Sequence, residues 1–110
     1  MNYKSPLFVN DLDSKMSCKI NQVREANPGL GDRLADYYGS KATIAFYPEI
    51  FLKSGIPEEE VNMLTGKFSD FVEKILGNGI NEITYMFNDN IPPLMGTEEN
   101  ALYIDEKMGL

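Results

Sequence analysis

The sequence predicts a single mainly α-helical domain, or an α+β domain in which helices dominate. The chain has 110 residues, of which 43% are apolar, so it is long enough to bury one core. Apolar residues recur at helical spacing in several segments, most clearly over residues 57–76. Pro and Gly stand where helices begin and end. No repeat or Gly/Ser linker divides residues 1–110, which we therefore treat as one domain.

The first third of the chain predicts two helices. The first begins near Asn10 or Asp11 and ends at "NPGLG", since a residue before proline is pushed out of the α region. Its apolar stripe comprises Val9, Leu12, Met16, Ile20 and Val23. A short second helix, "GDRLADYYG", follows, with Asp32 near its start and Gly39 at its end.

Residues 42–52, "ATIAFYPEIFL", are compatible with two structures. The β-forming residues "ATIAFY" predict a strand, followed by a short helix with Pro48 in its first turn and Gly55 just past its end. A single helix kinked at the proline is the alternative. Because the segment is apolar on nearly all sides, we expect it to be buried.

The strongest pattern is a long amphipathic helix over residues 57–76. Pro57 suits the first helical position, and three glutamates, Glu58–Glu60, fill the first turn at the positive end of the helix dipole. Gly77 and Gly79 predict its C-terminal cap. One apolar arc contains Val61, Leu64, Phe68, Phe71, Val72, Ile75 and Leu76.

The last third of the chain is compatible with a small antiparallel β element. In residues 80–88, Ile83, Tyr85 and Phe87 alternate as in a half-buried strand, although a helix fits nearly as well. Residues 100–106 either continue a helix that begins at Thr97 or pair with the first segment as a second strand. We favour a strand for residues 80–88 and leave 100–106 open.

The residue inventory favours a non-enzymatic protein without metal or cofactor. There is one cysteine, Cys18, and no histidine, which excludes an intramolecular disulfide and every nucleophile system that uses histidine as its base. Gly66 and Lys67 do not form a phosphate loop, because the glycine five residues earlier and the following Ser or Thr are missing. We therefore predict no catalytic residues.

Charge is distributed unevenly and predicts the kind of partner. The net charge is −7, made up of +1 over residues 1–41 and −8 over residues 42–110. Such a surface repels DNA, RNA and anionic lipid and favours a basic protein surface. The predicted partner-binding residues are Glu59, Met63, Asp70 and Glu73, on the exposed side of the long helix. This pattern predicts an interaction protein that binds, and inhibits or modulates, a partner.

Two other functions remain open. Apolar segments near both ends predict a structural subunit of a homo-oligomer, such as a virion or assembly component, through Leu7, Phe8, Ile91, Leu94 and Met95. An enzyme that uses carboxylates, Tyr37, Tyr38 or a lysine is the third possibility, and no motif supports it.

No apolar run is long enough to span a bilayer, and the start of the chain lacks the pattern of a signal peptide. We therefore expect a cytoplasmic protein without a membrane partner. The chain is short, acidic and rich in Asn and Met, and it lacks His and Trp. This composition resembles that of small accessory proteins encoded by phages and mobile elements.

Overall fold

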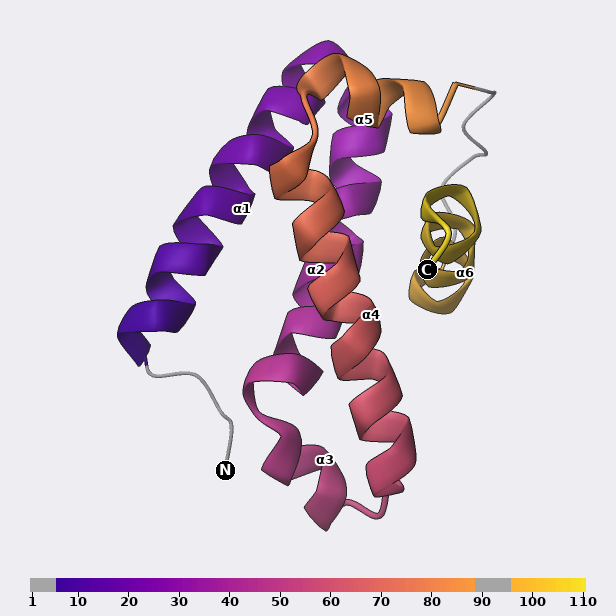
Figure 1. Ribbon diagram of the computed structural model, residues 1–110. Coiled ribbons are helices and arrows are strands. Elements are labelled where there is room, and N and C mark those ends of the chain that lie inside the picture. The colour runs from indigo at the N-terminus through magenta and orange to yellow at the C-terminus, as the bar shows by residue number, and fades with distance from the viewer. Residues whose placement is uncertain (1–5, 89–95) are drawn as a thin grey trace.

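Helices make up nearly all of the computed structural model, which describes residues 6–88 and 96–110, with side chains from residue 11 onward (Figure 1). The helices are α1 (Pro6–Ala26), α2 (Pro28–Phe46), α3 (Pro48–Lys53), α4 (Glu58–Gly77), α5 (Ile80–Met86) and α6 (Thr97–Met108). The prediction of a mainly helical fold is confirmed. These described ranges contain no strand, so the predicted β element is not found among them.

Helix α2 occupies the centre of the molecule. It contacts α1, α4, α6 and α3, whereas α5 closes one end against α1 (Figure 1). The radius of gyration is 14.1 Å, close to the value of about 13 Å expected for a globular domain of about 100 residues. The core therefore lies along both sides of α2.

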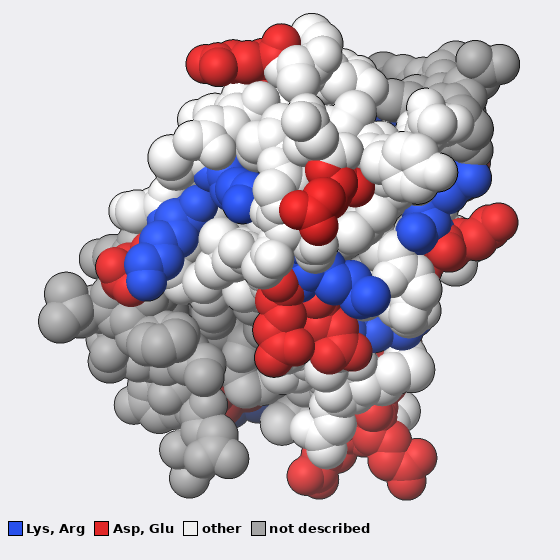
Figure 2. Space-filling model, turned by 45° about the horizontal axis from the view of Figure 1, so that its top comes forward, with Lys and Arg blue, Asp and Glu red and all other residues white. Residues whose placement is uncertain are grey.

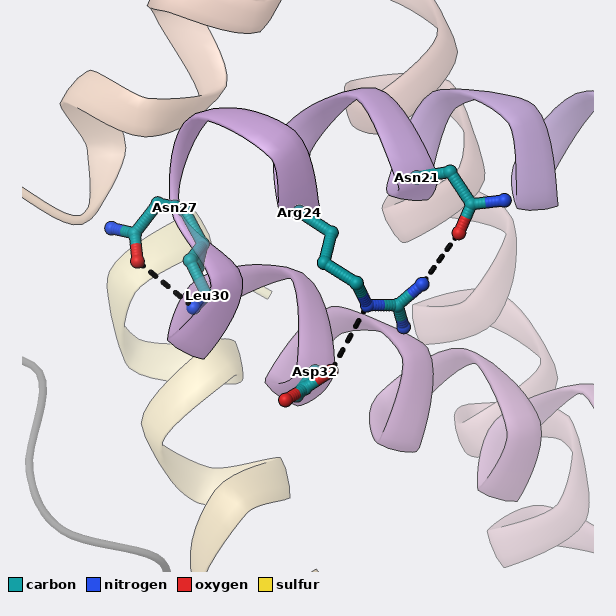
Figure 3. A network of polar contacts seen from close by, with 5 residues as sticks. All are labelled: Asn21, Arg24, Asn27, Leu30 and Asp32. Carbon is teal, nitrogen blue, oxygen red and sulfur yellow. Dashed lines mark hydrogen bonds and ion pairs between the residues drawn. The ribbon is translucent and has the colours of Figure 1, made fainter.

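A sharp corner joins α1 to α2. Helix α1 begins at Pro6, earlier than the predicted Asn10 or Asp11, and ends at Ala26. Asn27 then adopts extended backbone, and its side-chain oxygen accepts a hydrogen bond from the Leu30 N–H at 3.3 Å. Proline fits the next position because its missing N–H needs no partner in the first turn. The chain therefore ends one helix and caps the next within a single residue (Figure 3).

Gly31 allows the two helices to approach closely at this corner. A Cβ added to Gly31 would lie 2.5 Å from both Cα and Cβ of Arg24. The Arg24 guanidinium then spans the corner, donating from Nε to Asp32 Oδ1 at 3.0 Å and from a terminal nitrogen to Asn21 Oδ1 (Figure 3). The absence of a side chain at Gly31 therefore determines how near α1 lies to α2.

The predicted bounds of the second helix are wrong at both ends, because α2 begins at Pro28, ahead of Asp32, and continues past Gly39 to Phe46. Its buried stripe runs through the glycine, from Leu34 and Tyr38 before it to Ala42 and Phe46 after it. Burial of this stripe outweighs the cost of about 0.5–1 kcal/mol that a glycine imposes in mid-helix. Packing, rather than local propensity, therefore determines the length of α2.

Helix α2 ends just before Pro48. Tyr47, the residue before the proline, leaves helical geometry, and α3 follows with Pro48 at its start. Gly55 lies two residues past α3 with φ of +98°, as predicted for a glycine just past the helix. The strand alternative for "ATIAFY" is wrong, because residues 42–46 complete α2 and Tyr47 is its C-cap.

The expectation that residues 42–52 are buried holds for Phe46 and fails for α3. No residue of α3 is fully buried, and Tyr47, Ile50 and Leu52 are exposed. Helix α3 lies at the end of the molecule opposite α5, where it contacts α2 and α4 (Figure 1). The rest of the fold therefore leaves α3 open on its outer sides.

Helix α4 contributes a row of aromatic side chains to the core. Val61, Phe68, Phe71 and Ile75 are its buried residues. The Phe71 ring lies 4.6 Å from that of Tyr37, and the Phe68 ring lies 5.4 Å from that of Phe46. Pro57 stands at the N-cap rather than at the predicted first helical position, and the glutamates fill the first turn. The predicted glycine cap at the other end is wrong, because Asn78 is the C-cap and neither Gly77 nor Gly79 has a positive φ.

The strand interpretation of residues 80–88 is wrong, because residues 80–86 form α5. The Gly79 N–H donates to Glu82 Oε1 at 3.1 Å and starts the helix. Ile83 and Phe87 are buried whereas Tyr85 is exposed, and a strand would place all three on one face. Residues 100–106 belong to α6, and its buried residues Asn100, Ala101, Ile104 and Met108 follow helical spacing.

Replacement of Gly31 by alanine tests the close approach at the corner. We expect Gly31→Ala to lower the free energy of unfolding by about 1–3 kcal/mol, because the added methyl group meets the backbone of Arg24. Gly39→Ala is the matched control: no atom lies within 4 Å of its added Cβ, so it should stabilise by about 0.5–1 kcal/mol. Urea denaturation midpoints measure both, and an unchanged midpoint for Gly31→Ala contradicts the close approach.

Truncation of Phe71 tests the packing of α4 on α2. Phe71 is fully buried, so we expect Phe71→Ala to cost about 3–5 kcal/mol. Met63→Ala on the exposed side of the same helix should change stability by no more than about 0.5 kcal/mol. The same denaturation experiment compares them, and equal midpoints would show that α4 does not pack as described.

Candidate protein-interaction face

The outer side of α4 presents the four residues that the sequence singled out. Glu59, Met63, Asp70 and Glu73 are all exposed. Their spacing of four, seven and three residues places them on one side of a helix, opposite the buried residues of α4. We call these four residues the α4 face. It combines three carboxylates with one flexible apolar side chain.

Lys67, which lies between these residues in sequence, points elsewhere. Its Nζ lies 3.1 Å from Asp105 Oδ2 on α6, in an ion pair whose side chains are both mostly shielded from solvent. Lys74 is partly buried. The sequence places both lysines beside the acidic residues, but the structure pairs the charge of Lys67 inside the fold. The α4 face is therefore more acidic than the sequence alone indicates.

Asp105 joins three helices in one polar contact. Besides Lys67 of α4, it accepts a hydrogen bond from the Tyr37 hydroxyl of α2, at 2.6 Å between Oδ1 and the phenol oxygen. The ammonium group of Lys41 lies 5.6 Å from the centre of the Tyr37 ring. Because Asp105 has one oxygen for each main partner, α6 is fixed against both α2 and α4.

The two adjacent tyrosines of α2 both bind carboxylates. Burial first, and then the hydrogen bond to Asp105 and its negative charge, raise the pKa of Tyr37 above its usual value of 10.0. The Tyr38 hydroxyl donates to Asp13 Oδ1 at 2.8 Å, and its pKa is raised for the corresponding reasons. Each phenol therefore keeps its proton near neutral pH, which is unfavourable for a base or a nucleophile.

A second polar contact holds the start of α6. The Asn100 side chain is buried, and its Nδ2 donates to the Arg33 carbonyl and to Asp36 Oδ2, both at 3.0 Å. These partners lie more than 60 residues apart in the chain. Sequence reasoning missed both this contact and the Asp105 contact, because no local pattern marks residues that meet only in the folded protein.

Acidic side chains form several separate groups on the face shown in Figure 2. Those at the lower end of the view, the end that holds α3 and the start of α4 in Figure 1, lie beside uncharged surface. The first turn of α4 contributes Glu58–Glu60, all exposed. Because Tyr47, Ile50 and Leu52 are exposed at this end, carboxylates and apolar side chains occur together there.

Cys18 lines an open groove formed by residues of α1 and Leu76 of α4. The groove has a volume of about 640 Å³ and is lined by Ser14, Lys15, Cys18, Lys19, Gln22 and Leu76. The thiol is exposed, and the amide nitrogen of Gln22 is 4.0 Å from its sulfur. Lys15 is paired with Asp11 at 3.3 Å. Nothing in this arrangement supplies a base for the thiol.

No group of three or more His, Cys, Asp or Glu side chains within residues 11–88 and 96–110 could hold a metal ion. The helices described here also include none with the length and apolar character needed to cross a membrane. Of the predicted oligomer contacts, Ile91, Leu94 and Met95 lie outside the described residues, as do the side chains of Leu7 and Phe8.

Comparison of the chain with protein-family models, curated proteins and solved structures finds no match. Function must therefore be argued from the residues and their geometry.

The pH dependence of stability tests the Tyr37–Asp105 hydrogen bond. The folded state holds the Tyr37 proton more tightly than the unfolded chain, so the stabilisation is complete below pH 10 and is lost as pH rises above it. Above pH 10 the free energy of unfolding of the wild type falls as the pH rises. We expect that of Tyr37→Phe to fall less steeply, by about 1.4 kcal/mol per pH unit.

Urea denaturation at several pH values between neutral and strongly alkaline measures this slope. Tyr85→Phe is the matched control, because the Tyr85 side chain is exposed, and its curve should follow that of the wild type. A Tyr37→Phe curve parallel to the wild-type curve above pH 10 would contradict the described environment of Tyr37.

Proposed function

We propose that this protein is a non-enzymatic, acidic interaction protein that binds, and thereby modulates or inhibits, a partner protein with a basic surface. The observation that carries the proposal is the α4 face, where Glu59, Asp70 and Glu73 are exposed together while Lys67 is paired with Asp105. Met63 on the same side adds an apolar side chain that adapts to different partner shapes.

Charge supports a basic partner. Complementary charge raises the rate of encounter and selects against partners of the same sign, including nucleic acids and anionic membranes. The contact does not require the glutamates to be buried, because exposed charges act mainly through association rate and specificity. The proposal therefore includes binding that weakens as the salt concentration rises.

The residue inventory supports a role without catalysis. The chain has no histidine, and its two buried tyrosines each donate their hydroxyl hydrogen to a carboxylate. Cys18 is exposed, and the residues that line its groove include no carboxylate that could act as its base. The proposal therefore assigns the protein a binding role. Self-assembly remains the alternative, and the native mass of the protein tests it.

Neutralisation of the α4 face tests the proposal. The variant Glu59→Gln/Asp70→Asn/Glu73→Gln removes three charges from the α4 face. The matched control Glu98→Gln/Glu99→Gln/Glu106→Gln removes three exposed charges from α6. Each protein is immobilised, exposed to lysate of the source cells, and washed at salt concentrations from about 0.05 M to about 0.5 M, over which the screening of charges strengthens.

We expect the wild type and the α6 variant to retain the same basic protein at low salt and to release it at high salt, whereas the α4 variant fails to capture it. Equal capture by the α4 variant, or capture that does not depend on salt, would contradict the proposal.

A further inference from the structure

The exposed apolar side chains at the junction of α2 and α3 have no role in the fold described above. Tyr47 is 52% exposed and Ile50 is 61% exposed. Tyr47 is the N-cap residue of α3, and the Ile50 N–H donates to the Tyr47 carbonyl at 3.3 Å, so the two residues lie within the same turn. We call this pair the α3 knob. A six-residue helix gains little from helix formation alone, so exposing two large apolar groups in its first turn and at its N-cap is costly without a partner.

The surroundings of the α3 knob are acidic. Helix α3 packs on α4, and only residues 54–57 separate its end from the exposed glutamates Glu58–Glu60. Glu49 lies on α3 itself, and the one cation of the helix is Lys53. The α3 knob therefore combines apolar groups with a border of carboxylates, at the same end of the molecule as Glu59 of the α4 face.

Three kinds of surface could cover the α3 knob, and their charges show which of them fits the acidic surroundings. A second copy related by a two-fold axis would bring the glutamates of both copies together. An anionic membrane would be repelled by the same glutamates. A protein segment with apolar side chains flanked by Lys or Arg would satisfy both parts of the surface. This is the pattern of an amphipathic helix that docks its apolar side while its charges pair at the rim.

We propose that the α3 knob is the anchor point for such a basic amphipathic segment of the partner protein. The proposal rests on the proposed function and extends it: the α4 face attracts the partner, and Tyr47 with Ile50 holds an apolar side chain of the partner segment. Aromatic and aliphatic anchors of this kind carry most of the affinity at protein interfaces, with the charged rim contributing mainly to specificity and rate.

Defined peptides test the inference without knowledge of the partner. The probe is a synthetic peptide of about 18 residues, long enough to form a helix, with Leu at every third and fourth position and Lys elsewhere. A second peptide carries Glu in place of each Lys. Dissociation constants come from fluorescence anisotropy, and the contact is mapped by amide chemical shifts in the full-length protein.

The decisive variant is Tyr47→Ser/Ile50→Ser, and the matched control is Tyr85→Ser/Leu102→Ser, which removes a tyrosine and an aliphatic residue that are 75% and 69% exposed elsewhere. We expect the Leu/Lys peptide to bind the wild type with shifts confined to α3 and the start of α4. The α3 variant should bind at least about tenfold more weakly, and the control should bind as the wild type does. The Leu/Glu peptide should not bind.

Four outcomes overturn the inference: no saturable binding, shifts on another surface, equal affinity of the α3 variant, or equal affinity for both peptides. Self-association of the wild type that the α3 variant abolishes would also overturn it, since the occupant would then be a second copy. Thermal midpoints confirm that the variants fold, and Ile50→Lys provides a second, single-residue test. If the α4 variant loses the peptide while the α3 variant retains it, this inference fails and the proposed function stands.

Discussion

The contact between Tyr37 and Asp105 holds together the three helices on which the rest of the protein depends. The Tyr37 ring packs on Phe71 of α4, and its hydroxyl donates to the Asp105 carboxylate of α6. A carboxylate that is largely shielded from solvent is costly unless its oxygens are satisfied, and here Lys67 supplies the second partner. One acidic residue on α6 therefore determines how α6 sits on α2 and also where the ammonium group of Lys67 lies. This second effect connects the core to the surface, because it removes the cation from the α4 face.

The corner between α1 and α2 imposes a second constraint, which is purely steric. Asn27 and Pro28 end one helix and begin the next, and Gly31 lets the new helix lie against the backbone of Arg24 (Figure 3). Interiors are packed closely enough that a single methyl group at such a point must displace backbone. With this corner fixed, α2 packs against α1, α4 and α6, α1 also contacts α4, and the buried stripe of α2 continues past Gly39.

With these two constraints in place, apolar side chains at one end of the molecule stay more exposed to solvent than those at the other end. At the α5 end, Ile83 and Phe87 close the core, whereas at the α3 end no residue of α3 is fully buried. The acidic first turn of α4 begins at this same end, where its glutamates also stabilise the helix through its dipole. Two large apolar side chains, Tyr47 and Ile50, lie beside carboxylates at this end, whereas the α4 face has the single apolar side chain of Met63 among its carboxylates. The proposed partner contact uses both: charge along α4 for encounter and apolar contact at α3 for retention.

The sequence by itself determined the helical class, the four buried residues of α4, the break at "NPGLG" and the exposure of Glu59, Met63, Asp70 and Glu73, because each depends on periodicity or on the local geometry of Pro, Gly and Asn. Leu76, which periodicity also placed on the apolar arc, is exposed. Tertiary structure decided the rest. The β-forming residues of 80–88 form a helix because that geometry buries Ile83 and Phe87 while Tyr85 stays outside. Gly39 does not end α2, because α4 and α6 cover the stripe on either side of it. The partners of Asp105 and Asn100 lie 38 to 68 residues away. No local pattern identifies such pairs, since the free energy that brings them together comes from burial of the whole core rather than from their own sequence neighbourhood.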